Sequence, residues 1–440
     1  MERIKAWVEG ALKGGYDYEV YLEQRKKTLI ETSDESLENL LRAEDFGVGI
    51  RVFKDNKMGF AYTTDLREES VKETVKVAKE ICHITPPDEG FTLGGCQNWG
   101  NMESYYDQEG LKKPVEEKIE LLISLERKAK KLDSRVKGVR KTSLREIESH
   151  ILCLNSCGLF YEYKGTWYAS MMALLAEEDH DQSISYEYIG SRSLSSMPFD
   201  SMVEDVVFKA TSLLKPSSFE TKKIPVILYR DTSAMLLEAF SPIFLGDSLV
   251  KGKTLLKDKK GQKVFSEKLT LLDDGTIQDG FMSLPLDAEG YPTQRNVLVK
   301  DGVFKGFLHS SYSAIKSKEE PTGNSIRESF KSLPSSGITN LYIQPGEVSL
   351  EEMLKDQSEV LLITELMGLH TVDPVSGDFS LGASGLIYKK GKKHMSVRGV
   401  VIGGNIRDLW GSIIEVGKDF KFYGNVGSPS LYIKELTVGG

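Results

Sequence analysis

Hydrophobic residues recur at helical spacing in two stretches of the first hundred residues, between Ile4 and Ala11 and again between Val71 and Ile81. Short β-rich runs lie between these stretches and are separated by polar or glycine turns (YEVYLEQ, TLIET, FGVGIRVF, MGFAYT). This order predicts an antiparallel meander flanked by helices. The proline- and glycine-rich residues 85–111 have no such period and predict a linker.

A second unit begins after Pro114, where apolar residues from Val115 to Leu132 follow a strong helical period. Three β-rich runs come next (SHILCLN, GLFYEYKG, TWYASMMALLAEE), with turn residues at 155–158 and 164–165. They predict hairpins, and a further helix is predicted from about Met202 to Leu214.

From Ile224 onward, short strands and many glycines replace the long helical patterns. The whole pattern predicts an α+β fold, with an N-terminal helix-flanked sheet, a middle helix and hairpin unit, and a larger β-rich C-terminal domain. The predicted domains are residues 1–110 with the trailing linker, 111–220 and 221–440. A length of 440 residues agrees with about three domains.

The charge balance of this chain disfavours nucleic-acid binding as its main function. Lys and Arg total 57 against 65 Asp and Glu, which gives a net charge of -8 without a long run of either sign. The charged start lacks the features of a signal peptide, and no segment has the apolar length of a membrane helix. We therefore expect a soluble cytoplasmic protein that does not bind membranes.

The four cysteines are sparse for this length, and we expect them to be reduced thiols, as is usual in the cytosol. The closest pair, Cys153 and Cys157, has neither the spacing nor the neighbouring histidines of a zinc site.

Residues 368–385 (GLHTVDPVSGDFSLGASG) combine four glycines with His370, Asp373 and Asp378. So dense a mixture predicts a shaped loop at a functional site, although an irregular surface loop remains an alternative. A metal or acid–base site can be built from these residues. We favour a structural role, in which His370, Asp373, Asp378 and Asn405 shape a peptide groove or a subunit contact.

The acidic cluster at residues 177–181 surrounds one histidine with carboxylates. It could bind a hard cation, but a solvated turn after a strand is the favoured interpretation.

The C-terminal motifs resemble those of the TldD/PmbA family. The resemblance rests on LEAFSPIFLGD from Leu237, DAEGYPTQR from Asp287, TGNS from Thr322, residues 368–385 and RGVVIGGNIRDLW from Arg398. They occur in the family's order, and the first two domains also resemble the family.

The resemblance implies a degenerate metal site. The TldD branch carries His-Glu-x-x-x-His on a helix and a cysteine before a late Gly-Lys-Asp. In this chain Leu237, Glu238, Pro242 and Val416 occupy those positions. Leucine, proline and valine have no donor atom for a metal, so no catalytic residue and no metal ligand is predicted in this chain. Pro242 is also expected to prevent a long helix.

This pattern resembles the PmbA branch, also called TldE. The resemblance implies a non-catalytic subunit that pairs with a zinc-containing TldD-type protease subunit and processes or degrades unfolded peptides. We expect a homodimer when the chain is isolated. Two alternatives stay open: an autonomous hydrolase that uses an unrecognised site near Glu238 or His370, and a protein-binding regulator, since the branch has also been described as a modulator of DNA gyrase.

Overall fold

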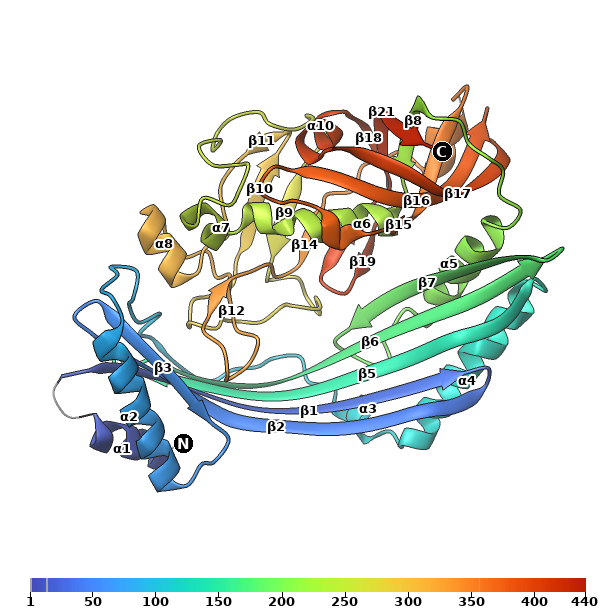
Figure 1. Cartoon of the computed structure of the whole chain (residues 1–440). Helices are drawn as coiled ribbons and strands as arrows, with labels where there is room; N and C mark the ends of the chain where they lie inside the picture. Colours follow the sequence, from blue (N-terminus) through green and yellow to red (C-terminus); the bar gives the residue numbers. More distant parts are fainter. Residues whose placement is uncertain (1, 13–14, 356) are drawn as a thin grey trace.

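The computed structural model of the chain describes residues 2–12, 15–355 and 357–440. A long curved sheet with its helices forms one half of the molecule, and a β-rich C-terminal half lies over the concave face of that sheet (Figure 1). This arrangement confirms the predicted α+β fold class.

Within the described residues, the curved sheet has seven strands, in the order β3-β2-β1-β5-β6-β4, with β7 also paired to β6. Their bounds are β1 Asp17–Ser33, β2 Ser36–Lys54, β3 Lys57–Thr63, β4 Asn98–Asn101, β5 Val136–Asn155, β6 Phe160–Glu178 and β7 Asp181–Ser191. Because β1 pairs with β5 from Glu19 to Thr32, the sheet continues across the predicted boundary at residues 110 and 111. That boundary stays a prediction.

The strands are longer than the sequence pattern indicated. The predicted turn at residues 164–165 is wrong, because β6 runs straight through it, with Lys164 opposite His150 and Gly165 opposite Ser149. The hydrogen-bond ladder to the long strand β5 outweighs the local turn preference of Lys-Gly. The turn between β5 and β6 is present near residues 155–159, as predicted.

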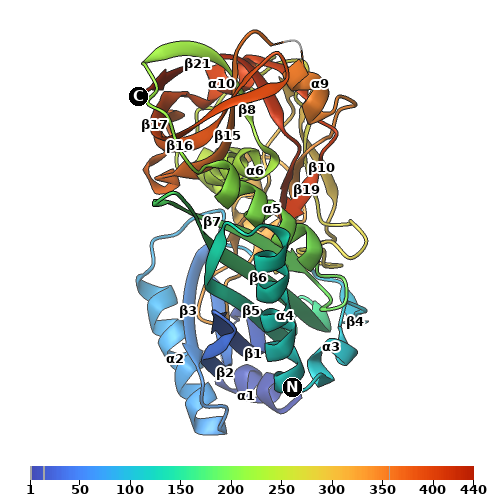
Figure 2. The same ribbon diagram turned by 90° about the vertical axis from the view of Figure 1, so that its right-hand side faces the viewer.

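Helices cover the convex face and one edge of the curved sheet. The bounds of the helices in this half are α1 Glu2–Ala11, α2 Glu68–Ile84, α3 Gln108–Lys112, α4 Val115–Leu132 and α5 Phe199–Ser212. Leu154 of β5 packs in the core beneath α1 and α2, and Leu144 packs in the core beneath α4 and α5. Successive strand residues alternate between faces, so these even-numbered residues of β5 leave the odd-numbered ones to face the C-terminal half. Figure 2 shows α5 at the junction between the two halves.

Two six-stranded sheets form the frame of the C-terminal half in the part of the chain that the structure describes. One has the order β11-β10-β9-β14-β20-β19 and the other β17-β16-β15-β8-β21-β18. The strand bounds are β8 Lys222–Leu228, β9 Leu271–Asp274, β10 Arg295–Lys300, β11 Val303–Phe304, β12 Ser325–Ile326, β13 Ser335–Ser336, β14 Leu341–Ile343, β15 Val360–Met367, β16 Asp378–Lys389, β17 Lys392–Asn405, β18 Ile413–Val416, β19 Lys421–Tyr423, β20 Val426–Ser428 and β21 Leu431–Gly439. The helices are α6 Arg230–Phe240, α7 Gly246–Val250, α8 Ser311–Ser317, α9 Leu350–Lys355 and α10 Ile406–Gly411, with short 3₁₀ turns at Ser241–Phe244 and Leu369–Thr371.

Two of the four cysteines are joined in a disulfide, Cys96–Cys157. The expectation of reduced thiols is therefore wrong for this pair, whereas Cys82 and Cys153 are free and buried. The partners lie 61 residues apart in sequence. The spacing of these two cysteines in the sequence therefore gave no signal of their disulfide. The disulfide depends on how the predicted linker folds back onto the turn between β5 and β6.

The predicted linker, residues 85–111, connects the two halves through direct contacts. Its strand β4 pairs in parallel with β6. The amide of Gly95 donates to the carbonyl oxygen of Glu289 at 2.8 Å, and the Trp99 indole donates to the carbonyl oxygen of Gly290 at 3.3 Å. The segment is thus held against the C-terminal half.

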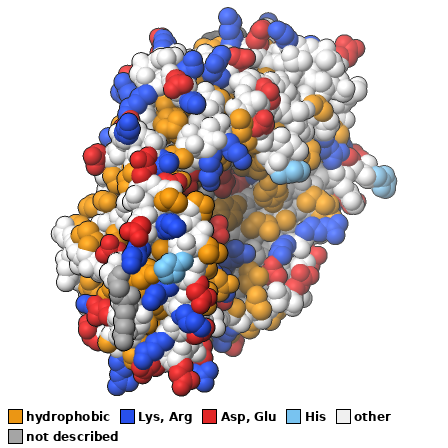
Figure 3. Space-filling model, turned by 60° about the vertical axis from the view of Figure 1, so that its left-hand side comes forward, with side chains coloured by type: hydrophobic (Ala, Val, Ile, Leu, Met, Phe, Trp, Pro, Cys, Tyr) orange, Lys and Arg blue, Asp and Glu red, His pale blue; other side chains and the backbone are white. Residues whose placement is uncertain are grey.

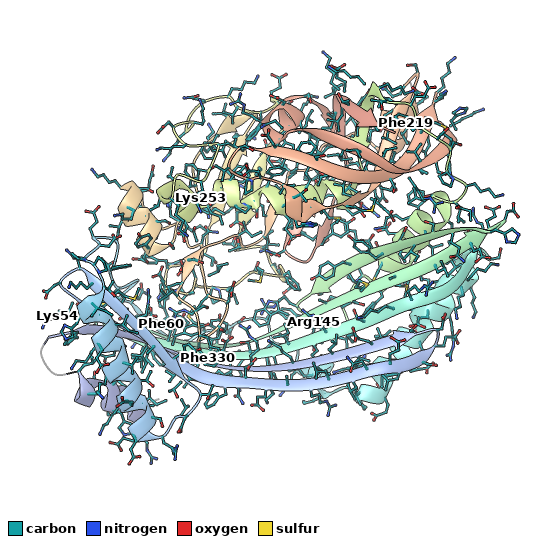
Figure 4. The ribbon with its side chains drawn as sticks, in the orientation of Figure 1. Lys54, Phe60, Arg145, Phe219, Lys253 and Phe330 are labelled. Carbon is teal, nitrogen blue, oxygen red and sulfur yellow. A yellow bond between two sulfur atoms is a disulfide. The ribbon has the colours of Figure 1, made fainter. Side chains whose placement is uncertain are left out.

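A loop that follows β12 reaches down from the C-terminal half and places Phe330 on the concave face near β2 and β3 (Figure 4). The Phe330 ring meets Tyr62 edge-on, with 6.1 Å between the ring centroids. A Cβ atom added at Gly47 of β2 would overlap that ring. Glycine at residue 47 therefore makes room for the buried aromatic side chain that connects the halves.

We predict that Gly47→Ala lowers the free energy of unfolding by about 1–3 kcal/mol, because the added methyl group overpacks the contact with Phe330. Gly10→Ala is the control, since a Cβ there meets nothing within 4 Å. Chemical denaturation of both variants measures the difference. Equal stability of the two variants would contradict the described packing of Phe330.

We also predict that Cys96 and Cys157 resist alkylation in the unreduced, denatured protein and react after reduction. Closure of a loop of this length by a disulfide stabilises a fold by roughly 2–4 kcal/mol. A Cys96→Ser, Cys157→Ser double variant should therefore unfold at lower denaturant concentration. Mass spectrometry after alkylation gives the answer directly: four labelled cysteines before reduction would show that the bridge is absent.

Candidate functional site

Helix α6 lies beside the edge strand β7 of the curved sheet and carries Leu237 and Glu238, two of the four positions at which the resemblance implies a degenerate metal motif. It follows the buried strand β8 and ends at Phe240, and a 3₁₀ turn with Pro242 near its start comes next. Proline lacks the amide hydrogen that would extend the helix, so the predicted break at Pro242 is confirmed.

The motif positions lie in different environments. Leu237 and Val416 are buried in the same hydrophobic core of the C-terminal half, whereas Glu238 is exposed and Pro242 is half-buried. Of these positions only Glu238 offers a donor atom. In the described ranges, no group of three or more His, Cys, Asp or Glu residues is placed to hold a metal ion. The residues present do not fit a zinc site.

A cavity of about 260 Å³ lies beside α6, between this helix and the edge strand β7. Its polar and aromatic walls come from β7, α5, α6 and the segment around β19. The lining includes Tyr186, Glu187, Tyr188, Lys209, Asp231, Met235, Glu238, Tyr423 and Asn425. The cavity thus joins the curved sheet to the degenerate motif.

A buried ion cluster forms one wall of this cavity. The Lys209 ammonium of α5 lies 2.7 Å from a carboxylate oxygen of Glu187 and 2.7 Å from one of Asp231. Burial alone would lower the pKa of Lys209, but Asp231 and Glu187 raise it above its ordinary value. The lysine is therefore held as a cation between one carboxylate of the curved sheet and one of α6.

A second set of charges extends the cluster toward solvent. Arg230 of α6 donates to Asp205 of α5 at 2.5 Å, and Lys421 of β19 donates to the other oxygen of Asp205 at 2.7 Å. Together with Lys209, these contacts join α5 to two elements of the C-terminal half. Such an arrangement fixes geometry and binds polar groups, but it contains no nucleophile next to a general base.

Sequence reasoning missed Lys209, Glu187 and Asp231. One signal was present, because Lys209 interrupts the apolar run VVFKAT of the helix predicted from about Met202 to Leu214. A lysine on a buried helical face needs a partner, although the sequence cannot say which carboxylate supplies it.

The predicted groove residues lie together at one end of β16 and β17. The Asn405 amide donates to Asp378 at 2.8 Å and to the carbonyl oxygen of Ser376 at 2.9 Å. Asp373 accepts from the backbone amide of Val375 at 2.8 Å, and hydrogen bonds from Val375 and Ser376 lower the pKa of Asp373. His370 is exposed on the adjacent 3₁₀ turn. The structure therefore joins Asp378 to Asn405 and gives Asp373 a role in the turn. The role of these residues in a peptide groove or a subunit contact stays a prediction.

Half of the glycine-rich block is regular structure. Residues 368–377 form the predicted loop, but residues 378–385 belong to the strand β16, so the loop prediction is wrong there. Gly385 lies against the carbonyl of Leu362 on β15, where a Cβ atom would overlap that oxygen. In this strand glycine permits close approach of two chains rather than a turn.

The acidic residues 177–181 lie at the end of β6, in the two-residue turn at 179–180 and at the start of β7. Lys215 pairs with Glu178 at 3.2 Å and with Asp179 at 2.7 Å, and Arg398 pairs with Asp181. The favoured interpretation as a charged surface turn agrees with these contacts.

The curved sheet with its helices and the overlying β-rich half together span the three domains of a metallopeptidase-type family. Three domain descriptions of one family match the chain: PmbA/TldA metallopeptidase domain 1 at residues 18–82, the central domain at 109–214 and the C-terminal domain at 221–440. The chain belongs to the PmbA/TldA metallopeptidase family, which confirms the resemblance seen in its motifs.

Individual relatives are similar to this chain along most or all of its length. Metalloprotease PmbA of Escherichia coli O157:H7 is 30% identical over 412 residues, which cover 92% of this chain and 88% of that protein. A candidate modulator of a DNA gyrase from Thermotoga maritima MSB8 is 26% identical, with a TM-score of 0.90 over 100% of both chains. TldE from Thermococcus kodakarensis is 24% identical, with a TM-score of 0.89 over 100% of both chains, and shares the fold.

Across the described ranges, none of the helices combines the length and apolar character needed to cross a membrane.

We predict that Lys209→Met lowers the free energy of unfolding by about 3–5 kcal/mol, because it leaves the buried carboxylates of Glu187 and Asp231 without their cation. Lys215→Met is the matched control on the surface, where Lys215 also meets two carboxylates but is half exposed, so little change is expected. Thermal and denaturant unfolding compare the two variants. A Lys209→Met protein as stable as the control would contradict the paired, buried state of this lysine.

Proposed function

We propose that this chain is a non-catalytic, PmbA/TldE-like subunit of a TldD-type metalloprotease complex that processes or degrades unfolded peptides. The observation that carries the proposal is the chemistry of α6 and β18. Leu237, Pro242 and Val416 stand where the TldD branch has two histidines and a cysteine, and none of them can bind zinc. The zinc and the reacting water therefore belong to the partner subunit.

The concave face of the curved sheet supports a role in holding peptide. Leu41 is 53% exposed, Ile184 55% and Tyr186 49%. Leu41 lies opposite Leu29, which in turn lies opposite Arg145 on the same face, and Ile184 and Tyr186 lie opposite Leu175 and Ala173. Figure 3 shows apolar side chains within the hollow between the two halves. Exposed apolar groups in a hollow suit the side chains of an unfolded chain.

The partner proposed is a TldD-type subunit, and a homodimer is proposed for the isolated chain. Family members share one fold, as the similarity to TldE illustrates, so a related subunit can use the same surface that joins two identical copies. The proposed site of action is the cytoplasm. His370, Asp373, Asp378 and Asn405 are proposed to belong to the subunit contact or to the edge of the peptide groove.

Regulation of another protein is the second candidate, because the Thermotoga maritima relative is described as a candidate modulator of a DNA gyrase. Direct binding to purified gyrase without any protease subunit would favour it. An autonomous hydrolase is the third, and it would be favoured if His370→Ala abolished a peptidase activity of the isolated chain while the protein stayed folded.

We predict that the complex purified from native cells contains a second protein with a His-Glu-x-x-x-His motif at equal stoichiometry, which mass spectrometry identifies. The isolated chain should not hydrolyse peptides with added zinc, and the mixture with that partner should do so until a chelator removes the metal. A mixture made with a partner that lacks both motif histidines is the control. Zinc-dependent hydrolysis by this chain alone, after rigorous purification, would overturn the proposal.

A further inference from the structure

A second cavity, of about 370 Å³, lies between the concave face of the sheet and the C-terminal half. It is separate from the cavity beside α6, and its lining shares no residue with that one. The walls come from β1, β5 and β6 on one side and from residues 281–293 and 323–339 on the other. No role for it follows from the degenerate metal motif.

The walls of this cavity are mainly apolar and aromatic. Ile147 and Ile151 of β5, Tyr163 and Trp167 of β6, and Phe281, Leu284 and Leu286 of the C-terminal half line it. Trp167 is held in place because its indole donates to the carbonyl oxygen of Phe281 at 2.9 Å and the Arg192 guanidinium lies 4.3 Å from its ring centroid. A preformed apolar pocket of this size accepts a large side chain.

Polar groups without partners lie in the wall of the same cavity. In the part of the chain that the structure describes, the Nε and Nη1 atoms of Arg327 and the hydroxyl oxygens of Ser149 and Ser325 are buried without a hydrogen-bond partner. All three residues line the cavity, and the Arg327 side chain is only 1% exposed. Buried donors without acceptors are costly, so a ligand that brings an acceptor to this wall would relieve that cost.

The surrounding charges indicate what kind of acceptor fits. Arg327 donates through Nη2 to Glu19 at 2.5 Å. Although burial opposes ionisation, Arg51 and Arg327 lower the pKa of Glu19 to about 2. Arg51 also pairs with Glu289 at 3.3 Å, and Arg25 pairs with Glu23. Three arginines thus already balance three glutamates.

Asp287 lies on the cavity wall as a further acid. Burial, and then the neighbouring Glu289, raise the pKa of Asp287 to about 7. An incoming carboxylate would add negative charge to a neutral or already negative cluster. An uncharged acceptor, such as a backbone carbonyl, satisfies the free Arg327 donors without that cost.

We propose that this cavity is a peptide-binding site. One bulky aromatic or aliphatic side chain of the peptide lies between Trp167, Phe281 and Leu284, and the Arg327 guanidinium donates a hydrogen bond to the adjacent backbone carbonyl of the peptide. The site belongs to this chain alone and needs neither a partner subunit nor proteolysis. Its chemistry selects unfolded segments, in which a large apolar side chain and its carbonyl are both accessible.

The test uses the full chain and the blocked tripeptide acetyl-Ala-(4-fluoro-Phe)-Ala-amide, observed by ¹⁹F NMR during titration. We expect saturable broadening or shift with a Kd on the order of 1 mM or tighter. The unfluorinated peptide should compete, whereas acetyl-Ala-Glu-Ala-amide should not. The free acid acetyl-Ala-(4-fluoro-Phe) should bind no better than the amide, and a tenfold preference for the acid would overturn the assignment of an uncharged acceptor.

Leu284→Trp, which fills the cavity, should weaken binding at least tenfold. Leu333→Trp is the matched control, because Leu333 is exposed on the neighbouring loop and does not line the cavity. Should Leu284→Trp prove unfolded by circular dichroism, Met282→Trp on the same wall replaces it. Absence of saturable binding, or equal binding by the folded cavity-filling variant and the control, would overturn the proposal. Neither outcome depends on whether a protease partner exists.

Discussion

Buried ion pairs set the position of the C-terminal half on the curved sheet. Lys209 joins Glu187 to Asp231 near one end of the junction, and Glu19 joins Arg51 to Arg327 near the other. A buried charge without its partner is very unfavourable, so each cluster tolerates little displacement of one half against the other. Apolar contacts alone would allow more sliding, because they have no direction. The hollow between the halves therefore has a defined shape.

The same ion pairs also fix the position of α6 between the two halves. On α6 the side chain of Leu237 packs into the core, while Asp231 of the same helix pairs with Lys209 across the junction. Helix α6 is thus held by its apolar side in the core and by the ion pair of Asp231, near its start, with Lys209.

The sequence was most informative where one local pattern determines the outcome. The apolar period from Val115 to Leu132 predicts α4 with the bounds that the structure has, and Pro242 marks the end of α6 within two residues. Contacts between distant segments left no such signal. The pairing of Cys96 with Cys157 and of Lys209 with Asp231 depends on how separate elements meet in space. Glycines were ambiguous for another reason: those of residues 378–385 permit close strand pairing, which a single sequence does not distinguish from a loop.

The continuity of the curved sheet has a consequence for how the chain folds during synthesis. Strand β1 has β2 beside it almost at once, but its other neighbour, β5, begins more than a hundred residues later: Thr32 pairs with Thr142 and Glu19 with Asn155. Until β5 leaves the ribosome, one edge of β1 has no strand to bind, and such edges are prone to join other chains. Pairing across so long a separation is also slow. The N-terminal strands are therefore synthesised well before the strand that completes their sheet. The time needed to translate the residues between β1 and β5 sets how long these strands are exposed to chaperones and to aggregation.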